Sequence, residues 1–201
     1  MCNGIQRLSG AVRFSGDNVL PHTQNVPETF LGSLIRERKV SPLPTQDSDE
    51  QFMRLALQQA HMALEEDQLP IGAVIIHQNV AISAGRNQVE LKQTDLAHAE
   101  LEAMLPVQAF LSAHAQECDI YTTLEPCMMC FGAIVNFHFR RLVVAAPDRL
   151  VGALSLIPHA PYYMRRAPAI TTGVLADESR AIIEQYVART NLRSHLLSSI
   201  H

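Results

Sequence analysis

The sequence predicts a three-layer α/β protein, with helices on both sides of a mixed sheet. The first observation is that helical and strand-like segments alternate in the order α-β-β-α-β-α-β-β-α. The second is composition, because 201 residues that are 47% hydrophobic and 18% charged are typical of a globular chain with one core. The third is that the longest apolar runs, such as residues 71–76, are too short to cross a bilayer.

The first predicted helix begins at Ser48-Asp49-Glu50-Gln51, which has the form of a capping box ahead of an amphipathic run. Apolar residues recur at helical spacing from there to about Glu66. After Pro70, residues 71–77 are strand-like, Gln78-Asn79 predicts a turn, and residues 80–85 return as a second strand.

A second long helix is predicted from about Ala97 to Ala113, with Pro106 ending or kinking it. Pro126 suits the first turn of the next helix, and Asp177 is a candidate cap for the last one. The remaining predicted elements are strands at 118–124, 142–146 and 170–175, and helices at 126–137 and 177–188.

Residues 1–47 are rich in Pro, Ser, Asn and Gly and are interpreted as an N-terminal extension or linker, partly disordered. Only residues 28–40 could form a short helix there. The acid-free stretch 1–16 weakly resembles an organellar transit peptide, but we interpret it as a disordered tail, and it has no apolar core of a secretory signal. Residues 48–201 are therefore expected to form the functional domain.

Charge is distributed unevenly along the chain. Residues 42–139 hold three basic and thirteen acidic residues, whereas residues 140–201 hold eight arginines and four acids. The basic part, with arginine pairs at 140–141 and 165–166, could contact a phosphate backbone. Alternatively, these charges are solvated and balance one another in three dimensions.

The four cysteines do not resemble a disulfide framework. Cys2 lies in the extension, Cys118 opens a predicted strand, and Cys127 and Cys130 are spaced as metal ligands. This usage favours a reducing compartment, and we expect a cytoplasmic protein.

The candidate site combines His98-Ala99-Glu100 with Pro126-Cys127-Met128-Met129-Cys130. One imidazole and two thiolates suit Zn²⁺, and no second CxxC or HxxxH pattern completes a closed four-ligand site. A three-ligand zinc keeps a position open for water, which is the arrangement of a hydrolytic site. Glu100 is not needed as a ligand and is available to move protons.

Two simpler interpretations of these residues exist. His98 could be a satisfied core or capping histidine, and Cys127 with Cys130 could form a redox pair. The redox interpretation leaves His98 and Glu100 unexplained. Asn87, two residues after Gly85, could by itself be a turn residue.

The most specific segments are 70–74, 85–87, 97–100, 123–134 and 172–178. Through them, residues from about 50 to 188 resemble the cytidine deaminase superfamily, most closely the bacterial tRNA-specific adenosine deaminases and the nucleoside and guanine deaminases. The resemblance implies a five-stranded sheet, zinc held by His98, Cys127 and Cys130, and Glu100 as the proton shuttle. It further implies that Asn87 hydrogen-bonds the target base and that the protein is a homodimer.

The expected function is zinc-dependent hydrolytic deamination of an amino-purine, foremost adenosine to inosine in tRNA. The alternatives are a deaminase of a free nucleobase or nucleoside (guanine, adenine or cytosine) and a non-catalytic nucleic-acid-binding relative. Several differences from the sequence pattern of tRNA-acting deaminases leave a free nucleobase as an alternative substrate. Residues 94–97 replace the usual Asp-Pro-Thr-Ala, Arg86 replaces an aromatic residue, Pro106 interrupts a helix, and residues 190–201 hold one arginine and no lysine.

Overall fold

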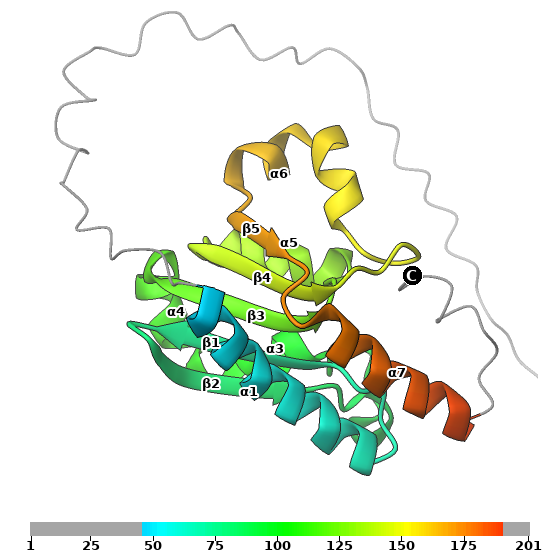
Figure 1. The fold of residues 1–201 in the computed structure, drawn as a ribbon. Coiled ribbons are helices and arrows are strands. Elements are labelled where there is room, and N and C mark those ends of the chain that lie inside the picture. Colours follow the sequence, from blue (N-terminus) through cyan, green and yellow to red (C-terminus); the bar gives the residue numbers. More distant parts are fainter. Residues whose placement is uncertain (1–45, 191–201) are drawn as a thin grey trace, which may run out of the picture. The chain divides into compact units, whose positions relative to one another are not determined.

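The computed structural model describes residues 46–190, which form a five-stranded mixed sheet in the order β2-β1-β3-β4-β5 (Figure 1). β1 pairs antiparallel with both β2 and β3, whereas β3, β4 and β5 are parallel. The strands are β1 Gly72–His77, β2 Val80–Arg86, β3 Cys118–Leu124, β4 Arg141–Ala146 and β5 Ala169–Thr172. The predicted fold class is confirmed, while the predicted extension lies almost entirely outside the described residues.

Helices cover both faces of this sheet, α1 and α7 on one and α3 and α5 on the other (Figure 1). The α-helices are α1 Gln46–Glu65, α2 Val89–Lys92, α3 Ala99–Met104, α4 Gln108–His114, α5 Met128–Phe137, α6 Pro161–Arg166 and α7 Ala176–Thr190. Short 3₁₀ segments are η2 Leu105–Val107, η3 Ala115–Glu117 and η4 Leu154–His159. Among the described helices, none is both long and apolar enough to span a membrane.

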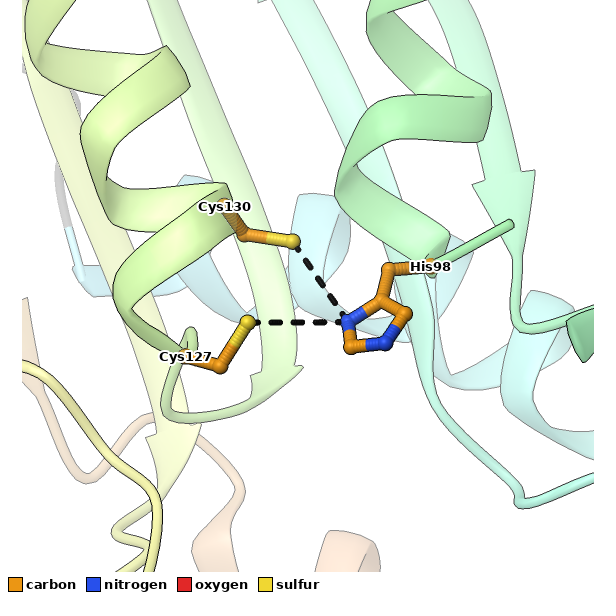
Figure 2. Close-up of side chains that lie close together, drawn as sticks. All are labelled: His98, Cys127 and Cys130. Carbon is orange, nitrogen blue, oxygen red and sulfur yellow. Dashed lines mark hydrogen bonds between the residues drawn. The ribbon is translucent and has the colours of Figure 1, made fainter. Parts of the chain in front are cut away.

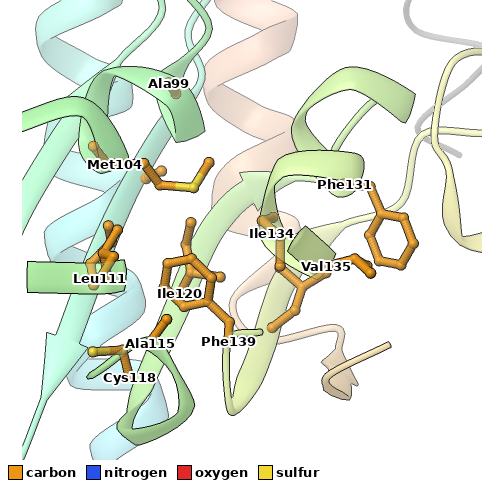
Figure 3. Packing of buried hydrophobic residues seen from close by; sticks show 14 of the residues in the cluster. Ala99, Met104, Leu111, Ala115, Cys118, Ile120, Phe131, Ile134, Val135 and Phe139 are labelled. Carbon is orange, nitrogen blue, oxygen red and sulfur yellow. The ribbon is translucent and has the colours of Figure 1, made fainter. Parts of the chain in front are cut away.

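Alternating strand residues build two separate hydrophobic layers, as the two-residue period of a strand requires. Ala73 and Ile75 of β1 face the helices α3, α4 and α5, where Ile134 and Phe139 also pack (Figure 3). Val74 and Ile76 face the opposite layer, whose helices are α1 and α7. The central strands β1, β3 and β4 are therefore buried on both sides, which explains the apolar runs of β1 and β4, whereas β3 also buries the polar residues Asp119, Thr122 and Thr123.

Two predicted breaks in the chain are confirmed. Gln78 and Asn79 both have positive φ, 49° and 63°, as the two-residue turn of a hairpin requires. At Pro106 the α-helical conformation gives way to η2 before α4 resumes the helix.

Three details of the predicted elements are wrong. Pro126 lies before α5 instead of inside it, because Cys127 is the extended N-cap residue of that helix. Asp177 is the second residue of α7 and its side chain is 94% exposed, so it lies in the first turn without capping it. The sequence analysis missed α2, η4 and α6, which are too short to show a helical period.

The predicted capping box at residues 48–51 is wrong as well, because α1 begins at Gln46. Residues 48–51 lie inside α1, and the Asp49 side chain is buried at the sheet. It accepts hydrogen bonds from the Tyr121 hydroxyl at 2.7 Å and from Arg141 Nη1 at 3.0 Å. Asp49 therefore joins α1 to β3 and β4 through a buried polar contact.

Candidate active site

His98 is the N-cap residue of α3 and is placed by a close approach between that helix and β2. A Cβ atom at Gly85 would lie 2.3 Å from the Ala103 nitrogen and 2.4 Å from the Ala99 oxygen, so only glycine permits this packing. The backbone of His98 is extended, with φ −75° and ψ 150°, and its carbonyl accepts a hydrogen bond from Glu102 N at 2.9 Å. Gly85 and the start of α3 together fix the imidazole at one edge of the site.

The two cysteines come from the start of α5, directly after β3. Cys127 is the N-cap residue, and its carbonyl accepts the first helical hydrogen bond from Phe131 N at 2.8 Å. Cys130 lies in the first turn and is fully buried. Because Cys127 is the cap and not a helical residue, its thiol points toward Cys130 from the chain just before the helix (Figure 2).

The three candidate ligands converge across the gap between the starts of α3 and α5 (Figure 2). His98 Nδ1 lies 3.6 Å from the sulfur of Cys127 and 3.6 Å from that of Cys130, and all three ligand atoms lie within 4.8 Å of one another. Zn–S and Zn–N bonds of ordinary length place nitrogen and sulfur about 3.5 Å apart across a tetrahedral ion. The spacing therefore fits zinc, and in residues 46–190 no further His, Cys, Asp or Glu joins this group.

The three candidate ligands differ in the direction of their pKa shifts. Hydrogen bonds from Cys130 and from His98 lower the pKa of Cys127 to about 3, so its thiolate is preformed. The hydrogen bond to Cys127 raises the pKa of His98, although burial of the ring opposes this shift. The hydrogen bond to Cys127 and burial raise the pKa of Cys130. Because a metal ligand must be deprotonated, a divalent cation would bind in competition with protons on His98 and Cys130.

Glu100 lies in the first turn of α3, two residues after His98, and is only 3% exposed. Burial of the carboxyl group raises its pKa above the usual value, because the charged form loses its hydration. A carboxyl group with a raised pKa can hold a proton near neutral pH and release it again. Glu100 lines the same cavity as His98 and Cys127 and is not one of the three grouped ligand residues.

A cavity of about 420 Å³ opens onto this group, within the usual range of small-ligand sites. His98, Glu100 and Cys127 form its reactive end. The other lining residues with apolar side chains are Leu69, Ile71, Val89, Ala99, Leu124 and Val151. The cavity thus combines these apolar walls with further polar side chains, namely Asn87, Glu90, Glu125 and Asp148.

Asn87 lines the same cavity, so the structure brings it together with the candidate metal ligands. It is 5% exposed, and its Oδ1 accepts a hydrogen bond from Val89 N at 3.3 Å. The neighbouring Arg86 points away to form an ion pair with Glu66. Asn87 therefore has both the local contact of a turn residue and a place in the cavity wall.

Among the lining residues with no role predicted from the sequence are Glu125, Asp148, Val151 and Tyr186. Glu125 lies within the segment 123–134 that resembles the deaminase family, but nothing in the sequence indicated a role for its side chain. Tyr186 comes from α7, far along the chain, and no local pattern marks it. Arg149 lines a shallower depression that shares Cys127 and Val151 with the cavity.

Comparison with known proteins shows which enzyme family the chain belongs to. Residues 46–146 match the model of the cytidine and deoxycytidylate deaminase zinc-binding region, and the chain belongs to this family. It is a zinc-dependent hydrolytic deaminase, and the fit of the three ligand atoms agrees with the zinc site of that family.

Three individual proteins that resemble this chain are deaminases that act on tRNA or on guanine. A tRNA-specific adenosine deaminase of Rickettsia felis is 34% identical over 145 residues, covering 68% of this chain and 99% of the relative. A structure from studies of A-to-I editing at the wobble position of transfer RNA is 33% identical, with a TM-score of 0.58, covering 66% of this chain and 98% of that one. A guanine deaminase from Nitrosomonas europaea is 25% identical, with a TM-score of 0.58, covering 87% and 100%.

Proposed function

We propose that this enzyme deaminates adenosine to inosine in tRNA. The observation that carries the proposal is the group of three metal-ligand atoms at the end of a cavity that also contains the buried Glu100 and Asn87. The substrate follows from the relatives, because those named tRNA-specific adenosine deaminase are about 34% identical to this chain over two thirds of its length. The guanine deaminase is less similar in sequence, at 25% identity.

Each site residue has a proposed task in this reaction. His98, Cys127 and Cys130 hold the zinc, which when bound supplies Lewis-acid activation of water. Glu100 takes a proton as the water oxygen forms a bond to the amino-bearing ring carbon. It then delivers that proton to the amino nitrogen, the C–N bond breaks, and ammonia leaves.

Asn87 is proposed to orient the target base by hydrogen bonding to its ring edge. Its Oδ1 is engaged by Val89 N, which fixes the amide plane, and the residue lines the cavity beside Glu100. An amide offers both a donor and an acceptor, so it can address a ring nitrogen and its neighbour at once.

A free purine base is the second candidate substrate. The guanine deaminase with TM-score 0.58 supports it, and so does a cavity whose walls are largely apolar. The departures at residues 94–97 and 86 from the tRNA-acting pattern point the same way.

An ammonia-release assay distinguishes the two candidates. It compares a tRNA anticodon stem-loop carrying a wobble adenosine with free guanine, adenine, cytosine and their nucleosides. We expect turnover of the stem-loop, falling steeply as salt rises because phosphate contacts are lost. Turnover of free guanine, with none on RNA, would overturn the tRNA proposal.

The assembly and compartment are also proposals. We infer a homodimer, since exposed apolar side chains gather around the shallow depression next to the cavity, namely Met128, Leu150, Val151 and Leu156. Light scattering on the purified protein tests this inference. We further propose that the deaminase domain spans residues 48–201 and that the enzyme works in the cytoplasm, where the thiols of Cys118, Cys127 and Cys130 would stay reduced.

A further inference from the structure

Glu125 holds the segment 148–154 against the end of β3. Its Oε2 accepts a hydrogen bond from Asp148 N at 3.1 Å, and its Oε1 accepts one from Leu154 N at 3.0 Å. One carboxylate thus receives the backbone N–H groups at both ends of this segment, which we call the 148–154 loop. Among residues 46–190 no arginine, lysine or histidine forms an ion pair with Glu125, so these two amides are its identified partners.

Hydrogen bonds within the loop fix its shape, and Gly152 lies close against the Glu125 carboxylate. Gly152 N donates to the Asp148 carbonyl at 3.0 Å, and Asp148 Oδ1 accepts from Leu150 N at 2.9 Å and Val151 N at 3.2 Å. A Cβ atom at Gly152 would lie 2.2 Å from the Asp148 oxygen and 2.4 Å from Glu125 Oε1. The loop therefore closes tightly around the Glu125 side chain, and glycine is required where the two meet.

This loop borders both the cavity and a candidate metal ligand. Asp148 and Val151 line the cavity, as does Glu125. Gly152 pairs with Cys127 in an isolated antiparallel bridge, and Ala153 N donates to the Pro126 carbonyl at 3.0 Å. The position of one cavity wall therefore depends on the contact between the loop and residues 125–127.

We propose that Glu125 is a positioning residue that fixes the 148–154 loop and thereby sets the substrate-facing wall at Asp148 and Val151. It contributes no group to the reaction and acts through the loop. Substitution with glutamine isolates this role, since the amide keeps one accepting oxygen but turns an NH₂ donor toward the other backbone N–H.

Amide hydrogen exchange measured by NMR on the zinc-loaded full chain tests the proposal. In Glu125→Gln, exchange should accelerate at least about tenfold at whichever of the Asp148 and Leu154 amides faces the new NH₂ group, the effect of losing one charge-assisted hydrogen bond. Amides of β4, such as Val143, should exchange as in the wild type. Unchanged loop exchange, or equal acceleration in β4, would overturn the proposal.

Kinetics and metal content provide a second readout. For the substrate that the wild-type enzyme deaminates, KM should rise about tenfold in Glu125→Gln while kcat stays within about threefold, because a loosened wall weakens substrate binding. Zinc content should stay at the wild-type level. A loss of zinc, or a lower kcat at unchanged KM, would contradict a positioning role through the loop. The exchange measurement does not depend on which base is deaminated, so failure of the tRNA proposal would leave it intact.

Two further variants test whether the effect comes from the contact between Glu125 and the loop. Gly152→Ala disturbs the same contact from the loop side, so its effect and that of Glu125→Gln should not add in the double variant. Glu178→Gln is the matched control. It removes a charge that accepts hydrogen bonds from Arg54 on the exposed surface, and it should leave exchange in the loop unchanged.

Discussion

Replacement of Asp49 by alanine should remove most of the hydrogen bonding of a buried arginine. Arg141 is 5% exposed and donates to both oxygens of Asp49, which also accepts from the Tyr121 hydroxyl. Arg141 Nε lies 3.3 Å from Asp119 Oδ2 but makes no hydrogen bond, and the two Asp119 oxygens accept from Arg140 instead. Without Asp49, the cluster of two aspartates and two arginines holds an excess positive charge in the interior.

Breaking a buried ion pair from one side costs about 3–5 kcal/mol. For a domain of this size that corresponds to a fall in Tm of about 6–20 °C. Thermal and urea unfolding of the zinc-loaded Asp49→Ala variant measure the loss. The matched control is Glu178→Ala, whose exposed ion pair with Arg54 should contribute no more than about 1 kcal/mol. A loss below about 1 kcal/mol in Asp49→Ala would refute the reasoning.

Three further predictions concern the site and a remote thiol. Glu100→Gln should lower kcat about 10²- to 10⁴-fold at unchanged zinc content, measured by ammonia release and metal analysis; activity near the wild-type level would remove its proposed role. Gly85→Ala should cost about 1–3 kcal/mol and lower zinc content, because the added Cβ displaces the start of α3. Gly173→Ala strains a backbone with φ +88° but adds a Cβ that meets nothing within 4 Å, so it should lower stability and still retain zinc. Burial raises the pKa of Cys118 to about 11, so its thiolate forms only in alkaline solution; mass spectrometry should find it unalkylated at pH 8 in the folded enzyme and alkylated after unfolding.

The metal-ligand group could be predicted from the sequence because its chemistry is local. The His-x-Glu and Cys-x-x-Cys spacings restrict which metal and which reaction the residues can serve, whatever the exact fold. The position of Cys127 at the start of α5 was predicted less accurately than the ligand group itself. Proline is common in the first helical turn, but here the helix begins two residues later and Cys127 becomes its cap.

The cavity wall was beyond prediction because tertiary packing assembles it from separate segments. Tyr186 reaches the cavity from α7, and Val151 reaches it from a loop whose conformation depends on a side chain 26 residues earlier. The central strands β1 and β4, by contrast, were predicted closely because each contains a continuous apolar run. η4 and α6 were missed because six residues each are too few to show a helical period.

The candidate zinc ligands come from opposite ends of a long chain interval, 29 residues apart for His98 and Cys127, and the sheet brings them together. Each ligand is held by backbone packing that does not involve an ion, through Gly85 for His98 and through the start of α5 for the cysteines. We therefore expect the polypeptide to fold without its metal, in contrast to a zinc finger, where the ion drives folding. Loading would then be a late maturation step, and chelation would yield a folded, inactive enzyme that added zinc restores.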